Sequence, residues 1–274
     1  MRRIALLALL SLLLTGCTNL FFMPMERLVR TPAEIGLEYR DVSFRSSDGT
    51  LLHGWWLPAK GTTRGTMLFL HGNAENISTH IASVHWLPEQ GYNVFLFDYR
   101  GYGKSQGASE IEGVIRDVES AIATTLELQK NSDQSIIVFG QSLGGGLAIY
   151  AVAHSAHRDQ IKALIVESGF SSYRQIAREK FAGFWLTWPL QYPLSWTVTD
   201  RYKPIDSVAD IAPIPLLLIY GKADSIVPYH HGQQLFDAAA PPKALWLIPD
   251  GRHIATFASP LQRQRLLDYL MALP

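Results

Sequence analysis

The sequence predicts an α/β fold, in which a mainly parallel, doubly wound sheet of about eight strands carries helices on both faces. From Thr66 onward, short apolar runs rich in β-branched residues alternate with stretches of helical periodicity. The polar residues best suited to chemistry directly follow several of these runs. Because the carboxyl ends of parallel strands meet at one edge of a sheet, where ligands bind, this placement favours the same fold.

The composition suits one large core rather than two small domains. Of the 274 residues, 47% are hydrophobic, which is enough to fill a single α/β domain. The 24 basic and 24 acidic residues balance, and no basic stripe is evident. Nucleic acid is therefore not an expected partner, because its phosphates are bound mainly by clustered positive charge.

The first 16 residues have the pattern of a secretory signal peptide. Arg2 and Arg3 precede an apolar run, Ile4–Leu14, which only Ser11 interrupts. This run of about eleven residues is too short to span a bilayer comfortably, since about twenty are needed. We expect a cleaved signal of the lipoprotein type, with an ordinary signal peptide or an uncleaved anchor as the alternatives.

Cys17 follows this run in the sequence Leu14-Thr15-Gly16-Cys17, which resembles the lipobox of bacterial lipoproteins. The resemblance implies cleavage before Cys17, lipid on this cysteine and a tether over residues 17–31. It also implies a periplasm-facing position in the bacterial cell envelope, and Thr18 favours the outer membrane. Cys17 is the only cysteine, so no internal disulfide can form.

Residues 32–274 form the predicted globular domain. Two strands, Leu37–Arg45 and Thr50–Leu57, are joined at Ser47-Asp48-Gly49, a sequence typical of hairpins. The other expected strands are 66–70, 93–97, 136–139, 163–166, 216–220 and 244–248. Helices are expected over about 77–87, 111–126, 147–152 and 261–270.

A long insertion separates two of the expected strands, at about residues 170–210. It is rich in aromatic residues and is broken by Pro189, Pro193 and Pro204. We interpret it as a small cap of one or two short helices over the site, with a core-packing helix plus loop as the alternative. An aromatic cap would favour apolar acyl or aryl groups and exclude water.

Ser142 is the centre of the predicted site. It lies in Gly140-Gln141-Ser142-Leu143-Gly144, between a buried strand and an apolar helix, the setting of a nucleophile elbow. The sharp turn forces strained backbone angles on the serine and leaves room only for glycines beside it. The helix N-terminus and the Leu143 N–H then favour negative charge near the hydroxyl.

A serine nucleophile needs a base and a carboxylate that orients the base, in the chain order serine, acid, histidine. Asp224 follows one buried strand and His253 follows the last strand, so both fit this order. Glu167 ends the strand after the elbow strand and is the best alternative acid. Asp250 lies close to His253 but precedes a glycine turn, so we interpret it as a turn former.

The tetrahedral oxyanion needs two donors, for which we predict the Leu143 N–H and the Asn73 N–H. Gly72 lets the backbone approach closely, and His71 is expected to order this loop. Asp98 is expected to brace the loop that follows it.

No grouping of side chains has convincing metal-ligand spacing, and the predicted chemistry needs no metal or cofactor. His80, His230 and His231 lie on helix patterns or solvent faces and indicate no function.

An ordered set of motifs now carries a family resemblance. The matching segments are Asp48-Gly49 before Leu52-His53-Gly54-Trp55, His71-Gly72-Asn73-Ala74, Asp98 to Ser105, Gly140 to Gly144, Gly221-Lys222-Ala223-Asp224 before Val227-Pro228, and His253. Together they resemble the α/β-hydrolases, and within them the BEM46/ABHD12/ABHD13-type serine hydrolases. The resemblance implies nucleophile Ser142, acid Asp224 and base His253. Tyr220 departs from the family, which often has histidine at this position.

The expected function is a lipid-anchored serine hydrolase that cleaves carboxylic esters of small acyl or lipid-like substrates through an acyl-enzyme. One alternative is an aminopeptidase or amidase with the same triad, in which Glu167 or Glu179 would hold the substrate ammonium. Another is a non-catalytic envelope binding protein, although such a protein would usually lack a triad member.

Overall fold

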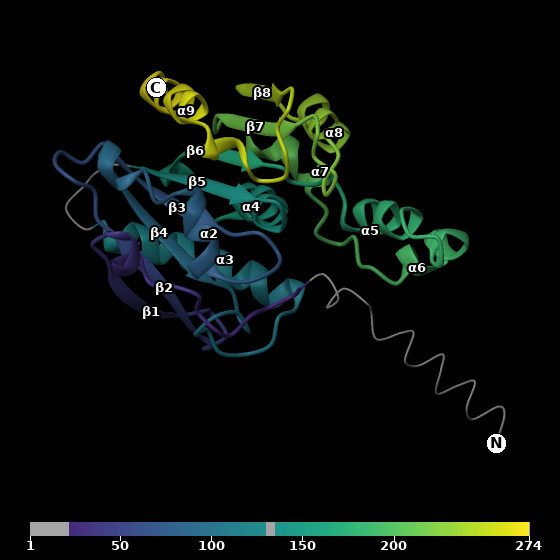
Figure 1. Cartoon of the computed structure of the whole chain (residues 1–274), viewed down its shortest axis with the longest axis horizontal. Coiled ribbons are helices and arrows are strands. Elements are labelled where there is room, and N and C mark those ends of the chain that lie inside the picture. Colours follow the sequence, from purple (N-terminus) through teal and green to yellow (C-terminus); the bar gives the residue numbers. More distant parts are fainter. Residues whose placement is uncertain (1–21, 130–134, 274) are drawn as a thin grey trace.

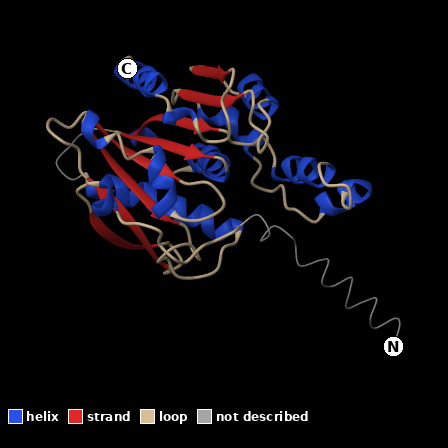
Figure 2. Ribbon diagram, viewed as in Figure 1, coloured by secondary structure: helices blue, strands red, loops and turns tan. Residues whose placement is uncertain are grey.

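The structure is a computed structural model that describes residues 22–129 and 135–273. The predicted signal peptide and the predicted lipidation site, Cys17, lie outside the described residues. Within them, the chain forms an eight-stranded sheet with the order β1-β2-β4-β3-β5-β6-β7-β8. The predicted α/β-hydrolase fold is confirmed, with strands and helices arranged in layers (Figures 1 and 2).

The sheet is parallel except for the strand that follows the hairpin turn. Strand β1 (Arg40–Arg45) pairs antiparallel with β2 (Leu51–Leu57), which in turn pairs antiparallel with β4. All pairs from β4 to β8 along the sheet are parallel. The remaining strands are β3 (Gly65–Leu70), β4 (Tyr92–Asp98), β5 (Ile136–Gln141), β6 (Ile161–Glu167), β7 (Leu216–Gly221) and β8 (Lys243–Ile248).

Helices cover both faces because the central strands are apolar on both sides. In β5, Val138 packs into one core, whereas its neighbours Ile137 and Phe139 pack into the other. The first core contains residues of α3 (Ile111–Leu128), α4 (Leu143–His154), α7 (Pro204–Ser207) and α8 (His230–Ala238). The second contains residues of α2 (Ile77–His80) and α9 (Pro260–Met271). Each core is sealed on its outer side by its helices.

One predicted helix is shorter than expected. Residues 77–87 contain only α2 and a 3₁₀ turn, η3 (Ile81–Ser83), and a second 3₁₀ turn, η4 (Pro88–Gln90), follows them. Its buried side chains Ile81, Val84 and Leu87 recur every three residues, a spacing that matches 3₁₀ geometry. The apolar pattern was therefore compatible with both helix types.

Between β6 and α7 the chain leaves the sheet and forms α5 (Tyr173–Ala182), the 3₁₀ turn η6 (Trp188–Leu190) and α6 (Gln191–Trp196). Figure 1 shows α5 and α6 standing to one side of the sheet, on the right of the view. Phe170 and Tyr173 anchor this insertion in the core, where both rings are buried. Of the helices in the described part of the chain, none is both long enough and apolar enough to cross a membrane.

Candidate active site

Ser142 occupies a strained turn between β5 and α4. Its φ of +52° and ψ of −115° are rare for a residue with a side chain. A Cβ at Gly144 would lie 2.2 Å from the Leu70 carbonyl oxygen, and one at Gly140 would lie 2.4 Å from the Gly144 carbonyl oxygen. Glycine is therefore required on both sides of the serine, as the predicted elbow demands.

The structure brings Ser142, His253 and Asp224 together in one hydrogen-bonded chain. The distance from Ser142 Oγ to His253 Nε2 is 3.0 Å, and from His253 Nδ1 to Asp224 Oδ2 it is 2.8 Å. The three residues follow β5, β8 and β7, so the carboxyl edge of the parallel sheet positions all of them. A hydroxyl beside an imidazole that a carboxylate orients has the arrangement of an activated nucleophile.

Two backbone amides hold the Asp224 carboxylate in place. The N–H groups of Ile226 and Val227 donate to its Oδ1 at 2.8 and 2.9 Å, which leaves Oδ2 for His253. Burial alone would raise the pKa of Asp224, but the bonds from His253 and these two amides outweigh burial, so its pKa lies below the ordinary value. Asp224 is thus ionised at neutral pH.

Glu167, the alternative acid, has other partners. The Gln141 amide donates to its Oε2 at 2.5 Å, and the Thr256 N–H donates to its Oε1 at 2.9 Å. Burial raises the pKa of Glu167, although these hydrogen bonds oppose the shift. Glu167 therefore connects Gln141, the residue before Ser142, with the loop after His253, a bridging position that the sequence did not reveal.

The loop after β3 faces the serine, as predicted. Asn73 and Leu143 both line the pocket at Ser142, and Leu143 is the first residue of α4, where helix N–H groups have no partner within the helix. Residues from outside this loop hold the Asn73 side chain. Its Oδ1 accepts from the Met23 N–H at 2.8 Å and from the Tyr102 hydroxyl at 3.1 Å. The two residues predicted as oxyanion donors are thus neighbours of the hydroxyl.

Buried polar groups order this loop. His71 has no exposed surface, and its Nδ1 donates to the Gly72 carbonyl at 2.7 Å. Asp98 accepts the Ile77 N–H at 2.9 Å, and its carbonyl accepts the Ser105 hydroxyl at 2.6 Å. Both observations agree with the bracing roles expected for His71 and Asp98.

The pocket at the serine has a volume of about 150 Å³ and a largely apolar wall. Its lining residues are Asn73, Ser142, Leu143, Phe170, Ile176, Lys180, Ile226 and Val227. Phe170 and Ile176 come from the insertion between β6 and α7. The only charged group in this lining is Lys180, whose ammonium donates to the Ser225 carbonyl at 3.1 Å. The pocket suits an apolar group beside the Ser142 hydroxyl.

Residues 61–212 match the α/β-hydrolase family described as serine aminopeptidase, S33 (Hydrolase_4). The chain belongs to the α/β-hydrolase family. Among relatives of the hydrolase, the YfhR protein of Escherichia coli (strain K12) is 36% identical over 261 residues, covering 93% of this chain and 87% of YfhR.

Eukaryotic relatives agree with the resemblance to BEM46-type proteins. The WAV2 α/β-hydrolase domain-containing protein of Arabidopsis thaliana is 35% identical over 240 residues, covering 84% of this chain and 77% of WAV2. The bem46 protein of Schizosaccharomyces pombe is 31% identical over 209 residues, covering 73% of this chain and 65% of bem46. The Pyrococcus furiosus esterase Pf2001 shares the fold, with a TM-score of 0.76, 24% identity and coverage of 92% and 98% of the two chains.

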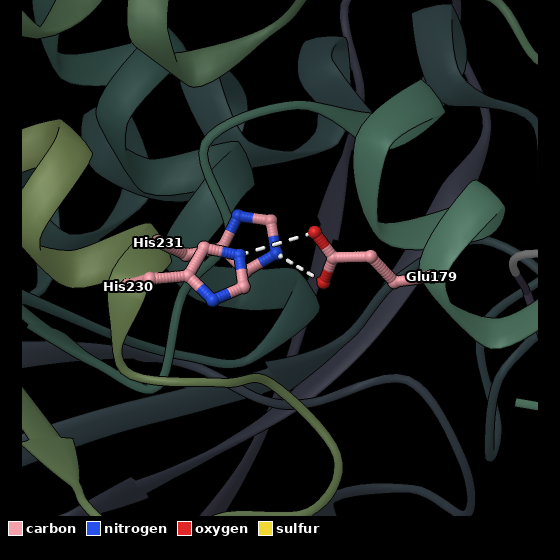
Figure 3. A group of neighbouring side chains, drawn as sticks. All are labelled: Glu179, His230 and His231. Atoms are coloured by element: carbon pink, nitrogen blue, oxygen red, sulfur yellow. Dashed lines mark hydrogen bonds and ion pairs between the residues drawn. The ribbon is translucent and has the colours of Figure 1, made fainter. Parts of the chain in front are cut away.

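A second cluster of titratable groups in the hydrolase joins α5 to α8. The ligand-type atoms of Glu179, His230 and His231 lie within 4.8 Å of one another, and Figure 3 shows both imidazoles pointing at the carboxylate. The Nε2 atoms of His230 and His231 each lie 3.1 Å from a Glu179 oxygen. Their spacing alone would be compatible with a metal ion.

The tautomer of His231 favours hydrogen bonding over metal ligation. Its Nδ1 accepts the Ser171 N–H at 3.2 Å, so in the neutral ring the proton sits on Nε2 and is donated to Glu179. A metal would need that Nε2 lone pair. Burial lowers the pKa of His231, which keeps the ring neutral. We therefore interpret the cluster as the link that fixes α5 against α8.

Proposed function

We propose that this α/β-hydrolase cleaves carboxylic esters of acyl or lipid-like substrates through a serine acyl-enzyme. The observation that carries the proposal is the continuous hydrogen-bonded chain from Ser142 through His253 to Asp224, at a pocket with an apolar wall. No metal or cofactor enters this mechanism.

In the proposed reaction, His253 Nε2 accepts the Ser142 proton while Oγ attacks the acyl carbonyl. The amides of Leu143 and Asn73 bind the resulting oxyanion. His253 then protonates the leaving alcohol as the C–O bond breaks. In the second half, His253 deprotonates a water that attacks the acyl-enzyme, and the carboxylic acid leaves as Ser142 regains its proton. Asp224 keeps the imidazole in the tautomer that this sequence needs.

A fluorophosphonate probe and a short p-nitrophenyl ester test the proposal directly. The protein should be labelled on Ser142, and Ser142→Ala should lose both the label and ester turnover, by at least about a thousandfold. An unaltered melting temperature in Ser142→Ala serves as the control for folding. A wild-type protein that neither takes the label nor hydrolyses short esters would contradict the proposal.

The family description favours a second candidate, an aminopeptidase with the same triad. That reaction needs an acidic group to hold the substrate ammonium, yet the charged group in the pocket lining is the Lys180 cation. Glu167 and Glu179, the acids considered for this role, are both engaged in hydrogen bonds. These contacts favour the esterase, and comparing turnover of an ester with that of an aminoacyl amide separates the two.

We also propose that lipid on Cys17 anchors the enzyme in the cell envelope, facing the periplasm. The support is the sequence Leu14-Thr15-Gly16-Cys17 behind a short apolar run. Cys17→Ser should no longer be labelled with a fatty acid in cells. It should also move from the membrane fraction to the soluble fraction, because it lacks the acyl chains that would anchor it. Unchanged fractionation of this variant would refute the anchor.

A further inference from the structure

The part of the insertion that follows α5 exposes an unusual group of large apolar side chains. We call it the cap surface, and its members have exposed fractions between 51% and 79%. They are Phe184, Trp185, Leu186, Trp188, Leu190, Tyr192 and Trp196. Residues 183–197 contain no charged residue at all. Such a concentration of exposed apolar groups marks a site of interaction rather than ordinary surface.

The distribution of tryptophan makes the same point. Three of the seven tryptophans lie on the cap surface, each at least 58% exposed. The other four, Trp55, Trp56, Trp86 and Trp246, are at most 8% exposed. The fold thus buries tryptophan everywhere else. Tryptophan and tyrosine, with an apolar ring and a polar tip, are the residues that favour the interface between lipid and water.

The described chain begins beside the same pocket that the insertion borders. The Met23 N–H donates to the Asn73 side chain, and Asn73 lines the pocket together with Ile176 and Lys180 of α5. In Figure 1 the purple start of the described chain and the helices α5 and α6 lie on the same side of the domain. Five peptide units connect Cys17 to Phe22, a reach of at most about 18 Å. Lipid on Cys17, proposed above, would therefore bring the membrane to the side of the domain that carries the cap surface.

Charge beside the cap surface also suits a bilayer. Arg174 and Arg178 of α5 line a hollow together with Tyr192 and Trp196, and the Arg178 guanidinium lies 5.5 Å from the centre of the Tyr192 ring. The single acidic residue of α5, Glu179, points toward the two histidines of α8 and is hydrogen-bonded to both (Figure 3). Positive charge next to exposed aromatic rings matches the anionic head groups of phospholipids.

We propose that the cap surface inserts into the interfacial layer of a phospholipid bilayer and holds the pocket mouth against it. This contact is separate from any lipid on Cys17. The idea that this contact delivers acyl substrates to the pocket rests on the proposed esterase function. The membrane contact itself does not depend on that function.

The test uses a chain that begins at Thr18, which lacks the lipidation site but keeps every residue of the described fold. It is mixed with vesicles of phosphatidylethanolamine and phosphatidylglycerol, and binding is measured by cosedimentation. Tryptophan quenching by brominated acyl chains reports insertion. The triple variant Trp185→Ser, Trp188→Ser, Trp196→Ser should bind at least about tenfold more weakly, because three interfacial rings are lost.

The matched control removes exposed apolar groups from α9, which lies away from α5 and α6 in Figure 1. Leu261 and Met271 of α9 are 73% and 59% exposed, so Leu261→Ser with Met271→Ser should leave vesicle binding unchanged. Equal loss in this control, or no vesicle binding by the parent chain, would overturn the proposal. If the triple variant fails to fold, Trp185→Ser alone is used instead, because Trp185 is the most exposed residue of the cap surface. This single variant should also bind vesicles more weakly than the parent chain.

Two further readouts separate the remaining outcomes. A concentration-dependent dimer that the triple variant abolishes, without vesicle binding, would assign the cap surface to a second copy and overturn the proposal. Turnover of a soluble short ester should be equal in parent and triple variant. Vesicle binding without any ester turnover would refute the proposed esterase while leaving the membrane surface intact.

Discussion

At the scale of single residues, backbone strain lies next to two of the three groups in the hydrogen-bonded chain. Ser142 has a φ of +52°, and Ile254, directly after His253, has a φ of +46°. A β-branched residue in this region is a true outlier, since its side chain clashes with the backbone. Strain of this kind persists only where surrounding contacts enforce it. Ser142 and His253 therefore depend on residues that hold their turns in place.

Asp98 provides a residue-scale prediction about pH. Burial raises the pKa of its carboxyl to about 7, from an ordinary value of 3.8, although amide hydrogen bonds oppose the shift. Between these values the folded protein holds a proton that the unfolded chain has released, so stability falls as pH rises. Wild-type stability should fall by about 1.4 kcal/mol per pH unit relative to Asp98→Asn over this window.

Urea unfolding of both proteins at several pH values between about 5 and 8 checks this expectation, because the midpoint and slope give the free energy of unfolding. The comparison removes the contribution of titratable groups that do not contact Asp98, and adding His71→Gln to both proteins removes that of the neighbouring His71, whose Nε2 lies 3.8 Å from Asp98 Oδ1. If the free energies of unfolding of the two proteins change in parallel with pH across the whole range, Asp98 is already ionised in the folded state.

At the scale of elements, Glu167 connects three parts of the site. It ends β6, accepts from Gln141 at the end of β5 and accepts from Thr256 in the loop after β8. Because Ile254 lies between His253 and Thr256, the Glu167–Thr256 bond constrains the strained turn at the base. If the proposed reaction holds, Glu167 acts as a positioning residue, because it is fully buried and bonded on both oxygens.

We expect Glu167→Ala to destabilise the protein by about 2 to 4 kcal/mol, since it leaves buried donors on Gln141 and Thr256 unpaired. The same change should lower kcat more than it raises KM, because the base loses its position while the pocket wall is unchanged. Glu167→Gln is the matched control and should retain most activity, since it still accepts from Thr256. Equal kcat in the alanine variant and wild type would exclude the positioning role.

The sequence predicted the strands and the hydrogen-bonded chain because both depend on local patterns. Buried strands such as β5 are continuous apolar runs, and Ser142, Asp224 and His253 follow such strands in a fixed order. Contacts between distant surfaces left no local signal. The bonds from Glu179 to His230 and His231 depend on how α5 meets α8, which no periodicity encodes. The predicted domain boundaries and lipidation site stay predictions.

At the scale of the whole molecule, the groups of the site come from widely separated parts of the chain. Ser142 and His253 are 111 residues apart, yet their side chains meet at 3.0 Å. Strands β5 and β6 lie inside the sheet, whereas β8 is its last strand and pairs only with β7. The side chains of β8 are mostly half-buried, unlike the fully buried residues of β5.

This edge position has a consequence for heat inactivation. Peripheral strands fray at lower free energy than central ones, so β8 and the turn carrying His253 should detach before the rest of the sheet melts. Ester turnover should then disappear several degrees below the midpoint seen by far-ultraviolet circular dichroism, and brief cooling should restore it. Coincident transitions would mean that the edge and the centre come apart as one cooperative unit. His253 would then leave its position at the same temperature at which the whole sheet unfolds, and not below it.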